Sequence, residues 1–155
     1  MNCAETCPTP DPARGAEARV VICNEMSEID RVRDMLDGFG HAHGVDPKLV
    51  IQLQVVVDEL VSNVIKYGWP EGGRHEVEVC LWLAADVVHI VIMDDGRAFN
   101  PCDAPSPPLN KGQRPRPGGV GIQMVRELID AIEYERIDGR NRTRITKRPA
   151  STPLQ

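Results

Sequence analysis

The sequence predicts an α+β domain in which helices cover one face of a mixed, mostly antiparallel sheet. The expected segments run in the order strand, helix, helix, two strands, long loop, helix, two strands. Each pair of strands is joined by a short turn, which predicts hairpins, and each helix has one apolar face that must pack on a second layer. Since 155 residues are enough for one core and few for two, we expect a single two-layer domain.

The β-branched run EARVVICN at 17–24 predicts the first strand. Ser27 followed by Asp30 resembles a capping box, and apolar residues at helical spacing predict a first helix over 27–39. The glycines of GHAHG at 40–44 are expected to end it, because glycine adopts turn conformations that other residues resist.

A second helix is predicted to begin at Asp46 and Pro47 and to run to Tyr67, where Gly68 ends it. An aspartate oxygen caps free backbone N–H groups, and the fixed φ of proline suits the first helical turn. The apolar stripe of this helix is formed by Leu53, Val57, Leu60 and Val64.

The same helix carries Glu59, Asn63 and Lys66 together on a second face. Taken alone, this polar ridge is explained more simply as a solvated face with a Glu-to-Lys pair. Asn63 is the unusual member, because asparagine is a mediocre helix former whose amide oxygen can ligate Mg²⁺. Glutamate can accept a proton and lysine can meet phosphate, so the ridge also fits phosphate chemistry.

The second half of the chain predicts two hairpins and one helix. Strand-like runs at 75–84 and 86–95 are joined by a tight turn near Ala85 and Asp86. Six prolines make 101–117 a loop, and GGVGIQMVRELIDAI at 118–132 predicts the third helix. The last hairpin is expected from IEYERID and RTRITKR around the turn DGRN at 138–141.

Composition and charge exclude several classes of protein. A formal net charge of -5 gives no footprint for nucleic acid, and no apolar run approaches the ~20 residues of a membrane span. Without a signal peptide, a cytoplasmic protein is expected, and its five cysteines are expected to be reduced thiols. Cys3 and Cys7 could supply two ligands of a metal site, but no second pair of Cys or His ligands follows at a suitable spacing.

Three motifs carry the chemistry. ELVSNVIKY (59–67) holds the polar ridge, DDGRAFNP (94–101) puts carboxylates and a glycine at the end of a buried strand, and GGVGI (118–122) opens a helix. Bare N–H groups and the positive end of the helix dipole favour phosphate there. A lone glycine run at a helix start is weak, since glycines also cap and turn, but three such motifs in this order are stronger.

These motifs resemble the N, G1 and G2 boxes of the histidine-kinase-like ATPases with the Bergerat fold. Within that superfamily the short length, AFNP and the ending ERIDGRNRTRITKR are similar to stand-alone anti-sigma factor serine kinases. The resemblance covers about residues 18–148 and implies a Bergerat-type domain over 17–148, with 101–117 as its lid. The Pro-rich, polar composition of residues 1–16 predicts a disordered tail before this domain, and 149–155 is expected to be a C-terminal tail.

The resemblance also implies ATP, Mg²⁺ and a set of site residues. Glu59 matches the general base, Asn63 the Mg²⁺ ligand, and Lys66 a phosphate-facing or lid-facing position. Asp94 matches the aspartate that accepts a hydrogen bond from the adenine amino group, and Gly96 leaves room for the base. The remaining nucleotide-binding residues that the resemblance implies are Ala98, Gly118, Gly119, Val120, Gly121, Ile122 and Thr143.

Other charged residues near these motifs are open to two interpretations. Arg97, Arg114 and Arg116 are phosphate partners or ordinary loop charges, and Asp95 is expected to be a solvent-facing neighbour of Asp94.

The function implied is that of an ATP-dependent protein serine/threonine kinase that sequesters a sigma factor and phosphorylates a STAS-type anti-sigma factor antagonist in a partner switch. Such proteins commonly form homodimers. A nucleotide-binding module that regulates a partner without transfer is the first alternative. The second is a histidine-kinase catalytic fragment that acts on a separate phosphoacceptor. A self-contained sensor histidine kinase is disfavoured, because no phosphoacceptor-histidine helix pair or transmembrane sensor precedes the domain.

Overall fold

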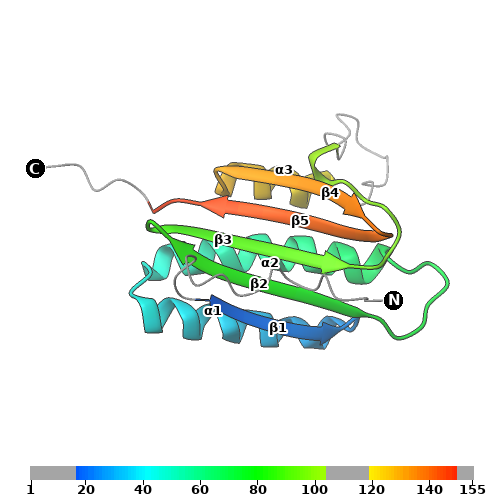
Figure 1. The fold of residues 1–155 in the computed structure, drawn as a ribbon, viewed down its shortest axis with the longest axis horizontal. Coiled ribbons are helices and arrows are strands. Elements are labelled where there is room, and N and C mark those ends of the chain that lie inside the picture. Colours follow the sequence, from blue (N-terminus) through cyan, green and yellow to red (C-terminus); the bar gives the residue numbers. More distant parts are fainter. Residues whose placement is uncertain (1–16, 104–118, 150–155) are drawn as a thin grey trace, which may run out of the picture.

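The computed structural model describes residues 17–103 and 119–149 of the chain. Five strands form one sheet, and helices cover one of its faces, as predicted (Figure 1). In chain order the elements of this described part are β1 (Glu17–Cys23), α1 (Ile29–His43), α2 (Pro47–Tyr67), β2 (Glu76–Ala84), β3 (Val87–Asp94), α3 (Gly119–Leu128), β4 (Ala131–Ile137) and β5 (Arg140–Lys147).

The strand order across the sheet is β1-β2-β3-β5-β4, and every pair of described neighbours is antiparallel. Both predicted hairpins are confirmed. Ala85 and Asp86 have φ of 50° and 64°, and Asp138 and Gly139 have φ of 52° and 75°. Two consecutive residues with positive φ make the kind of two-residue turn whose twist suits paired strands. In this strand order β5, the last of the described strands, lies inside the sheet between β3 and β4.

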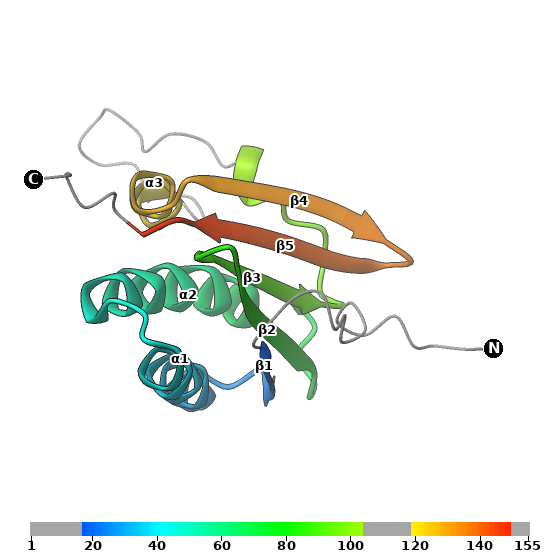
Figure 2. The same cartoon turned by 60° about the vertical axis from the view of Figure 1, so that its left-hand side comes forward.

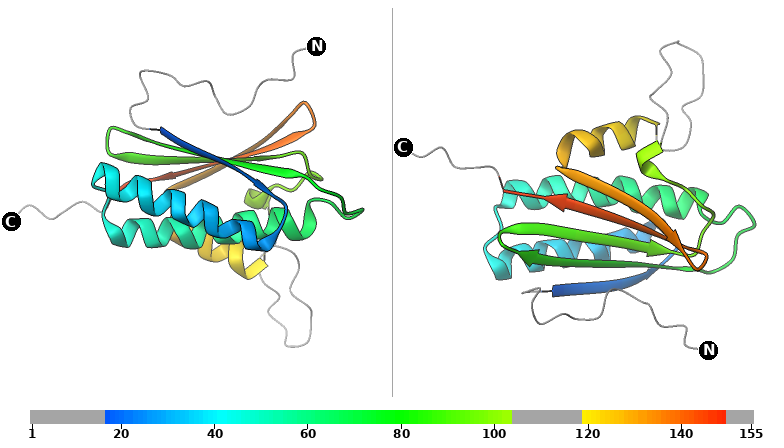
Figure 3. Two further views of the ribbon diagram at one scale, coloured as in Figure 1. Left: turned by 90° about the horizontal axis from the view of Figure 1, so that it is seen from below. Right: turned by 45° about the horizontal axis from the view of Figure 1, so that its top comes forward.

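The two layers are clear in Figures 2 and 3, where α1, α2 and α3 lie on the same side of the sheet. The core fills the space between them. From α2, Leu53, Val57 and Leu60 of the predicted stripe are buried, whereas Val64 is half-buried and packs at the edge of the core. Ile90 of β3 is completely buried on the sheet side. The layer contact thus fixes α2, the helix that carries the polar ridge, across the middle of the sheet.

The other face of the sheet carries a smaller apolar cluster of Trp82, Val91 and Met93. Trp82 stacks on His89 with ring centroids 5.0 Å apart, so the two aromatic rings pack against each other on this face. Among the described cysteines, Cys23 and Cys102 are free thiols and Cys80 is disulfide-bonded, so the expectation of reduced thiols is wrong for Cys80. No described helix has the length and apolar character needed to cross a membrane.

The first helix differs most from its prediction. Ser27 caps nothing, since it lies within a 3₁₀ turn at Met26–Glu28 that precedes α1. The helix continues through Gly40 and ends only at Gly44, which has a φ of 66°. Gly40 is there for packing, because a Cβ at this position would lie 2.5 Å from Val50 Cγ2. The glycine predicted to break the helix instead lets α1 and α2 approach closely.

The second helix has both of its predicted ends, and the third is shorter than predicted. Asp46 Oδ1 accepts a hydrogen bond from the Lys48 N–H at 2.9 Å, as expected of a capping residue. The third helix ends at Leu128, because Ala131 and Ile132 pair with β5 in the sheet. Of the predicted loop 101–117, only a 3₁₀ turn at Pro101–Asp103 is described, and both predicted tails lie outside the described residues apart from position 149.

Candidate functional site

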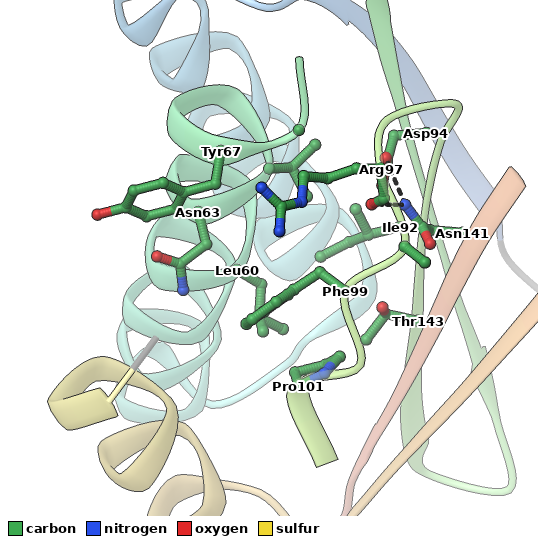
Figure 4. Close-up of a pocket in the computed structure, with 13 residues that line it drawn as sticks. Leu60, Asn63, Tyr67, Ile92, Asp94, Arg97, Phe99, Pro101, Asn141 and Thr143 are labelled. Carbon is green, nitrogen blue, oxygen red and sulfur yellow. Dashed lines mark hydrogen bonds between the residues drawn. The ribbon is translucent and has the colours of Figure 1, made fainter. Parts of the chain in front are cut away.

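A cavity of about 320 Å³ lies between the C-terminal half of α2 and the ends of β3 and β5 (Figure 4). Its wall is mostly apolar with a few polar groups, which is typical of small-molecule sites. The lining residues are Leu60, Asn63, Val64, Tyr67, Gly68, Ile92, Asp94, Arg97, Ala98, Phe99, Pro101, Asn141 and Thr143.

Asp94 is the acidic group of this cavity and is only 3% exposed. Its Oδ1 accepts hydrogen bonds from the Gly96 N–H and from Asn141 Nδ2, both at 2.9 Å. No described residue donates to its Oδ2. Burial raises the pKa of Asp94 above its ordinary value, while the two hydrogen bonds and the charge of Arg136 work against that rise and Asp95 adds to it. The carboxylate thus has one anchored oxygen and one that remains available to a ligand.

Asn63 supplies the polar group on the helix side of the cavity. Its side chain is largely buried, and its Nδ2 has no hydrogen-bond partner among the described residues. An unpaired buried amide N–H is costly, so a bound group with an acceptor oxygen would stabilise this site. The described residues include no cluster of three or more His, Cys, Asp or Glu able to hold a metal. A cation beside Asn63 would therefore need most of its ligands from a bound molecule and water.

Glu59 lies one turn before Asn63 on α2 and faces the start of α3. A Cβ built on Gly121 would be 2.0 Å from Glu59 Oε2, so the absence of a side chain at Gly121 makes room for this carboxylate. The contact is held by the packing of α3 on α2, in which Ile122 and Val125 are fully buried. The first turn of α3 and the Glu59 carboxylate therefore meet beside the cavity.

Arg126 joins α3 to the segment that leaves the cavity. Its guanidinium donates to the backbone carbonyls of Pro101, at 2.9 Å, and Cys102. The thiol of Cys102 in turn lies 3.5 Å from the Ile132 carbonyl, and burial raises the pKa of this thiol. Because Pro101 lines the cavity, α3 is tied to the cavity rim as well as to Glu59.

The site residues expected from the sequence separate into two groups. Asn63, Asp94, Ala98 and Thr143 line the cavity together. Lys66 is exposed near the end of α2 and Ile122 is buried in the core, so neither side chain reaches the wall.

The expected glycines are only partly described, and one has an unexpected neighbour. Gly96 is not among the lining residues but lies against two of them, since a Cβ there would lie 2.9 Å from the Gly68 Cα and carbonyl oxygen and from Asp94 Oδ1. Gly119, Val120 and Gly121 open α3, and Gly118 lies outside the described residues.

Several residues that line the cavity were not predicted from the sequence, and the role of one other was left undecided. Asn141 was expected in a turn, yet it belongs to β5, and its alternation with Thr143 on one face was the signal that could have identified it. Arg97, whose role the sequence left open, lines the cavity, and Figure 4 shows its guanidinium extending toward the side formed by Asn63 and Tyr67. Asp95 is exposed as expected and accepts a hydrogen bond from Trp69 Nε1 at 3.1 Å.

The model of a protein family, the histidine kinase-like ATPase domain, matches residues 23–147. The chain belongs to this family. A serine/threonine-protein kinase, BtrW of Bordetella bronchiseptica, is 30% identical over 104 residues, which are 66% of this chain and 73% of BtrW.

Two solved structures share the histidine kinase-like ATPase fold. The crystal structure of the RsbU and RsbW domains of Rv1364c from Mycobacterium tuberculosis has a TM-score of 0.61 at 17% identity, covering 86% of this chain and 32% of that one. The histidine kinase domain of the blue-light activated histidine kinase from Erythrobacter litoralis has a TM-score of 0.51 at 12% identity, covering 79% and 59%. The chain therefore spans about a third and three fifths of these two solved chains.

Proposed function

We propose that this histidine kinase-like ATPase domain is a protein serine/threonine kinase that uses ATP and Mg²⁺. The observation that supports it best is the cavity in which a buried carboxylate with one available oxygen, Asp94, lies across from Asn63 with its unpaired amide. The similarity to the serine/threonine-protein kinase BtrW supports the same class of reaction.

The adenine of ATP binds among the apolar side chains of the wall. Leu60, Ile92 and Phe99 supply apolar contacts to the flat adenine ring, and Thr143 adds a hydroxyl beside Asp94. The available Oδ2 of Asp94 accepts a hydrogen bond from the adenine amino group. A buried acceptor of this kind rejects a base that presents another acceptor, because both would then be left unpaired.

The phosphates lie toward Asn63 and the start of α3. Backbone N–H groups at the beginning of a helix are unpaired and favour anions, so the segment Gly118–Ile122 binds phosphate oxygens. Lys66 and Arg97 add positive charge on the α2 side. Mg²⁺, when bound, neutralises charge on the phosphates and would be held by Asn63 Oδ1.

The transfer step requires a base for the attacking hydroxyl. The hydroxyl oxygen of a serine or threonine on the acceptor protein bonds to the γ-phosphorus, and the bond from that phosphorus to the β–γ bridging oxygen breaks to leave ADP. The hydroxyl proton passes to the Glu59 carboxylate. General-base assistance of this kind contributes about 10²–10⁴-fold.

The short length, AFNP at 98–101 and the ending at 135–148 are similar to those of anti-sigma factor serine kinases, and this similarity supports the proposed protein partners. The domain, as a cytoplasmic homodimer, holds a sigma factor and so regulates transcription. It phosphorylates a STAS-type antagonist, whose unphosphorylated form captures the kinase and releases the sigma factor.

The test is transfer of labelled γ-phosphate from ATP to a purified antagonist encoded beside the kinase. Wild type is expected to yield acid-stable phosphoserine or phosphothreonine, and Glu59→Gln to lower the rate about 10²–10⁴-fold while binding ADP normally. Glu127→Gln is the matched control, since Glu127 is exposed on α3 and the charge change is the same.

Three results would contradict the proposal in different ways. Tight nucleotide binding without any transfer would make the domain a regulatory module. An acid-labile product would make it the catalytic part of a histidine kinase. Equal transfer by Glu59→Gln would remove Glu59 from the role of base.

A further inference from the structure

Three polar residues form a row across the helix-facing side of the sheet at the end of the cavity. In the strand register, Asp94 of β3 pairs with Asn141 of β5, and Asn141 pairs with Arg136 of β4. Asn141 is 5% exposed and lines the cavity beside Asp94 (Figure 4). It therefore lies between a buried carboxylate and a guanidinium.

The hydrogen bonds of Asn141 leave only one orientation for its amide. Its Nδ2 lies 2.9 Å from Asp94 Oδ1, 3.0 Å from the Arg97 carbonyl oxygen and 3.3 Å from the Gly96 carbonyl oxygen. Its Oδ1 accepts from Tyr134 Oη at 2.5 Å and from Arg136 Nη1 at 2.8 Å. A flipped amide would set an oxygen against three acceptors and an NH₂ against a guanidinium, so the side chain has a fixed donor face toward Asp94.

This arrangement decides which atom of Asp94 a ligand meets. The Asn141 amide and the Gly96 N–H both bind Oδ1, which prevents the carboxylate from rotating about its terminal bond. No described donor reaches Oδ2, so its lone pairs are available to a ligand in the cavity that Asp94 lines. The same amide holds the carbonyls of Gly96 and Arg97, so it also fixes the backbone that follows β3 at the cavity.

We propose that Asn141 is a positioning residue that holds Asp94 by Oδ1 and presents Oδ2 as a hydrogen-bond acceptor, so that the cavity selects adenine over guanine. The inference rests on the proposed function, since it assigns the base that the nucleotide site accepts. Adenine carries an amino donor at the position where guanine carries a carbonyl acceptor. A guanine oxygen would therefore face an oriented carboxylate oxygen and be repelled by it.

The charge state of Asp94 provides a readout that a purely structural role would not change. The groups that act on it are Asn141, the Gly96 N–H, Asp95 and Arg136. The Asn141 hydrogen bond favours the ionised form, so its loss raises the pKa of Asp94 further. If ADP binding needs the carboxylate, the pH at which acid abolishes binding moves upward when Asn141 is replaced.

The experiment measures binding of ADP and GDP, with Mg²⁺, to the full chain by calorimetry over a series of pH values. Asn141→Ala removes the donor, and Asn141→Asp keeps the shape but replaces the donor with an acceptor. Both are expected to lower ADP affinity and the preference for ADP over GDP about tenfold or more, and to move the acid midpoint upward. Arg140→Ala, on the same strand, is the control with no described contact to Asp94 and is expected to behave as wild type.

A milder variant covers the case in which Asn141→Ala fails to fold. Tyr134→Phe removes only the hydroxyl that donates to Asn141 Oδ1, so its effects are expected in the same direction and smaller. Suppose that wild type prefers ADP and that Asn141→Asp keeps both the wild-type preference for ADP over GDP and the wild-type acid midpoint. This result would overturn the inference and leave the proposed function standing. A wild-type protein that binds neither nucleotide would overturn the proposed function and the inference with it.

Discussion

The contact between Gly121 and Glu59 gives the sharpest prediction about catalysis. In Gly121→Ala the new Cβ would lie 2.0 Å from Glu59 Oε2, and real Cβ contacts essentially never fall under 3.0 Å. The carboxylate must therefore move by at least about 1 Å. A misplacement of about 1 Å can cost about 10²-fold in rate, so we expect phosphate transfer to fall about 10²-fold, or roughly 2.7 kcal/mol of activation free energy.

The fold of this variant is expected to survive. The clashing atom is the end of a flexible side chain, and alanine is favoured over glycine within a helix by about 1 kcal/mol. Thermal unfolding and calorimetric ADP binding check that the loss lies in the transfer step. Gly38→Ala is the matched control, because Gly38 lies within α1 and a Cβ there meets nothing within 4 Å. Wild-type transfer by Gly121→Ala would refute the assignment of a positioned Glu59.

Two further predictions concern the acidic end of the cavity. Because the pKa of Asp94 is raised above 3.8 in the folded state, native protein without nucleotide loses stability as pH rises through that raised pKa. Asp94→Asn removes this loss, so the free energy of unfolding of the variant, relative to that of wild type, should rise with pH in urea unfolding. A difference in free energy that stays constant with pH would contradict the raised pKa of Asp94. In Gly96→Ala the new Cβ would lie 2.9 Å from backbone atoms of Gly68. We therefore expect thermal unfolding to show a destabilisation of about 1–3 kcal/mol, and calorimetry to show weaker ADP binding. Wild-type stability and ADP affinity in this variant would contradict the packing described.

Much of the fold could be predicted because local signals and tertiary packing agree. The cap at Asp46, the apolar stripe of α2 and the turn at Ala85 and Asp86 each depend on neighbouring residues, and each is found as expected. Gly40 shows where local reasoning ends. A glycine that breaks a helix and a glycine that lets two helices approach look the same in a sequence, and only the nearness of Val50 distinguishes them.

The site was predictable to the extent that its residues lie in short motifs. Asn63 and Asp94 belong to such motifs, and both line the cavity. Asn141 lies 47 positions from Asp94 and meets it only because β5 enters the sheet beside β3. In the sequence it resembles a turn residue after Asp138 and Gly139, and no local pattern gives the strand register. Ala131 and Ile132 were assigned to a helix for the same reason, since their pairing partners are at the end of the chain.

Calorimetric titration of the folded protein with ADP, in the presence and absence of Mg²⁺, tests the central claim most directly. We expect one ADP to bind per chain, more tightly with Mg²⁺, and Asp94→Asn to weaken that binding strongly. The absence of binding heat in well-folded protein at several temperatures, or equal affinity in Asp94→Asn, would contradict the claim that an adenine nucleotide binds in this cavity.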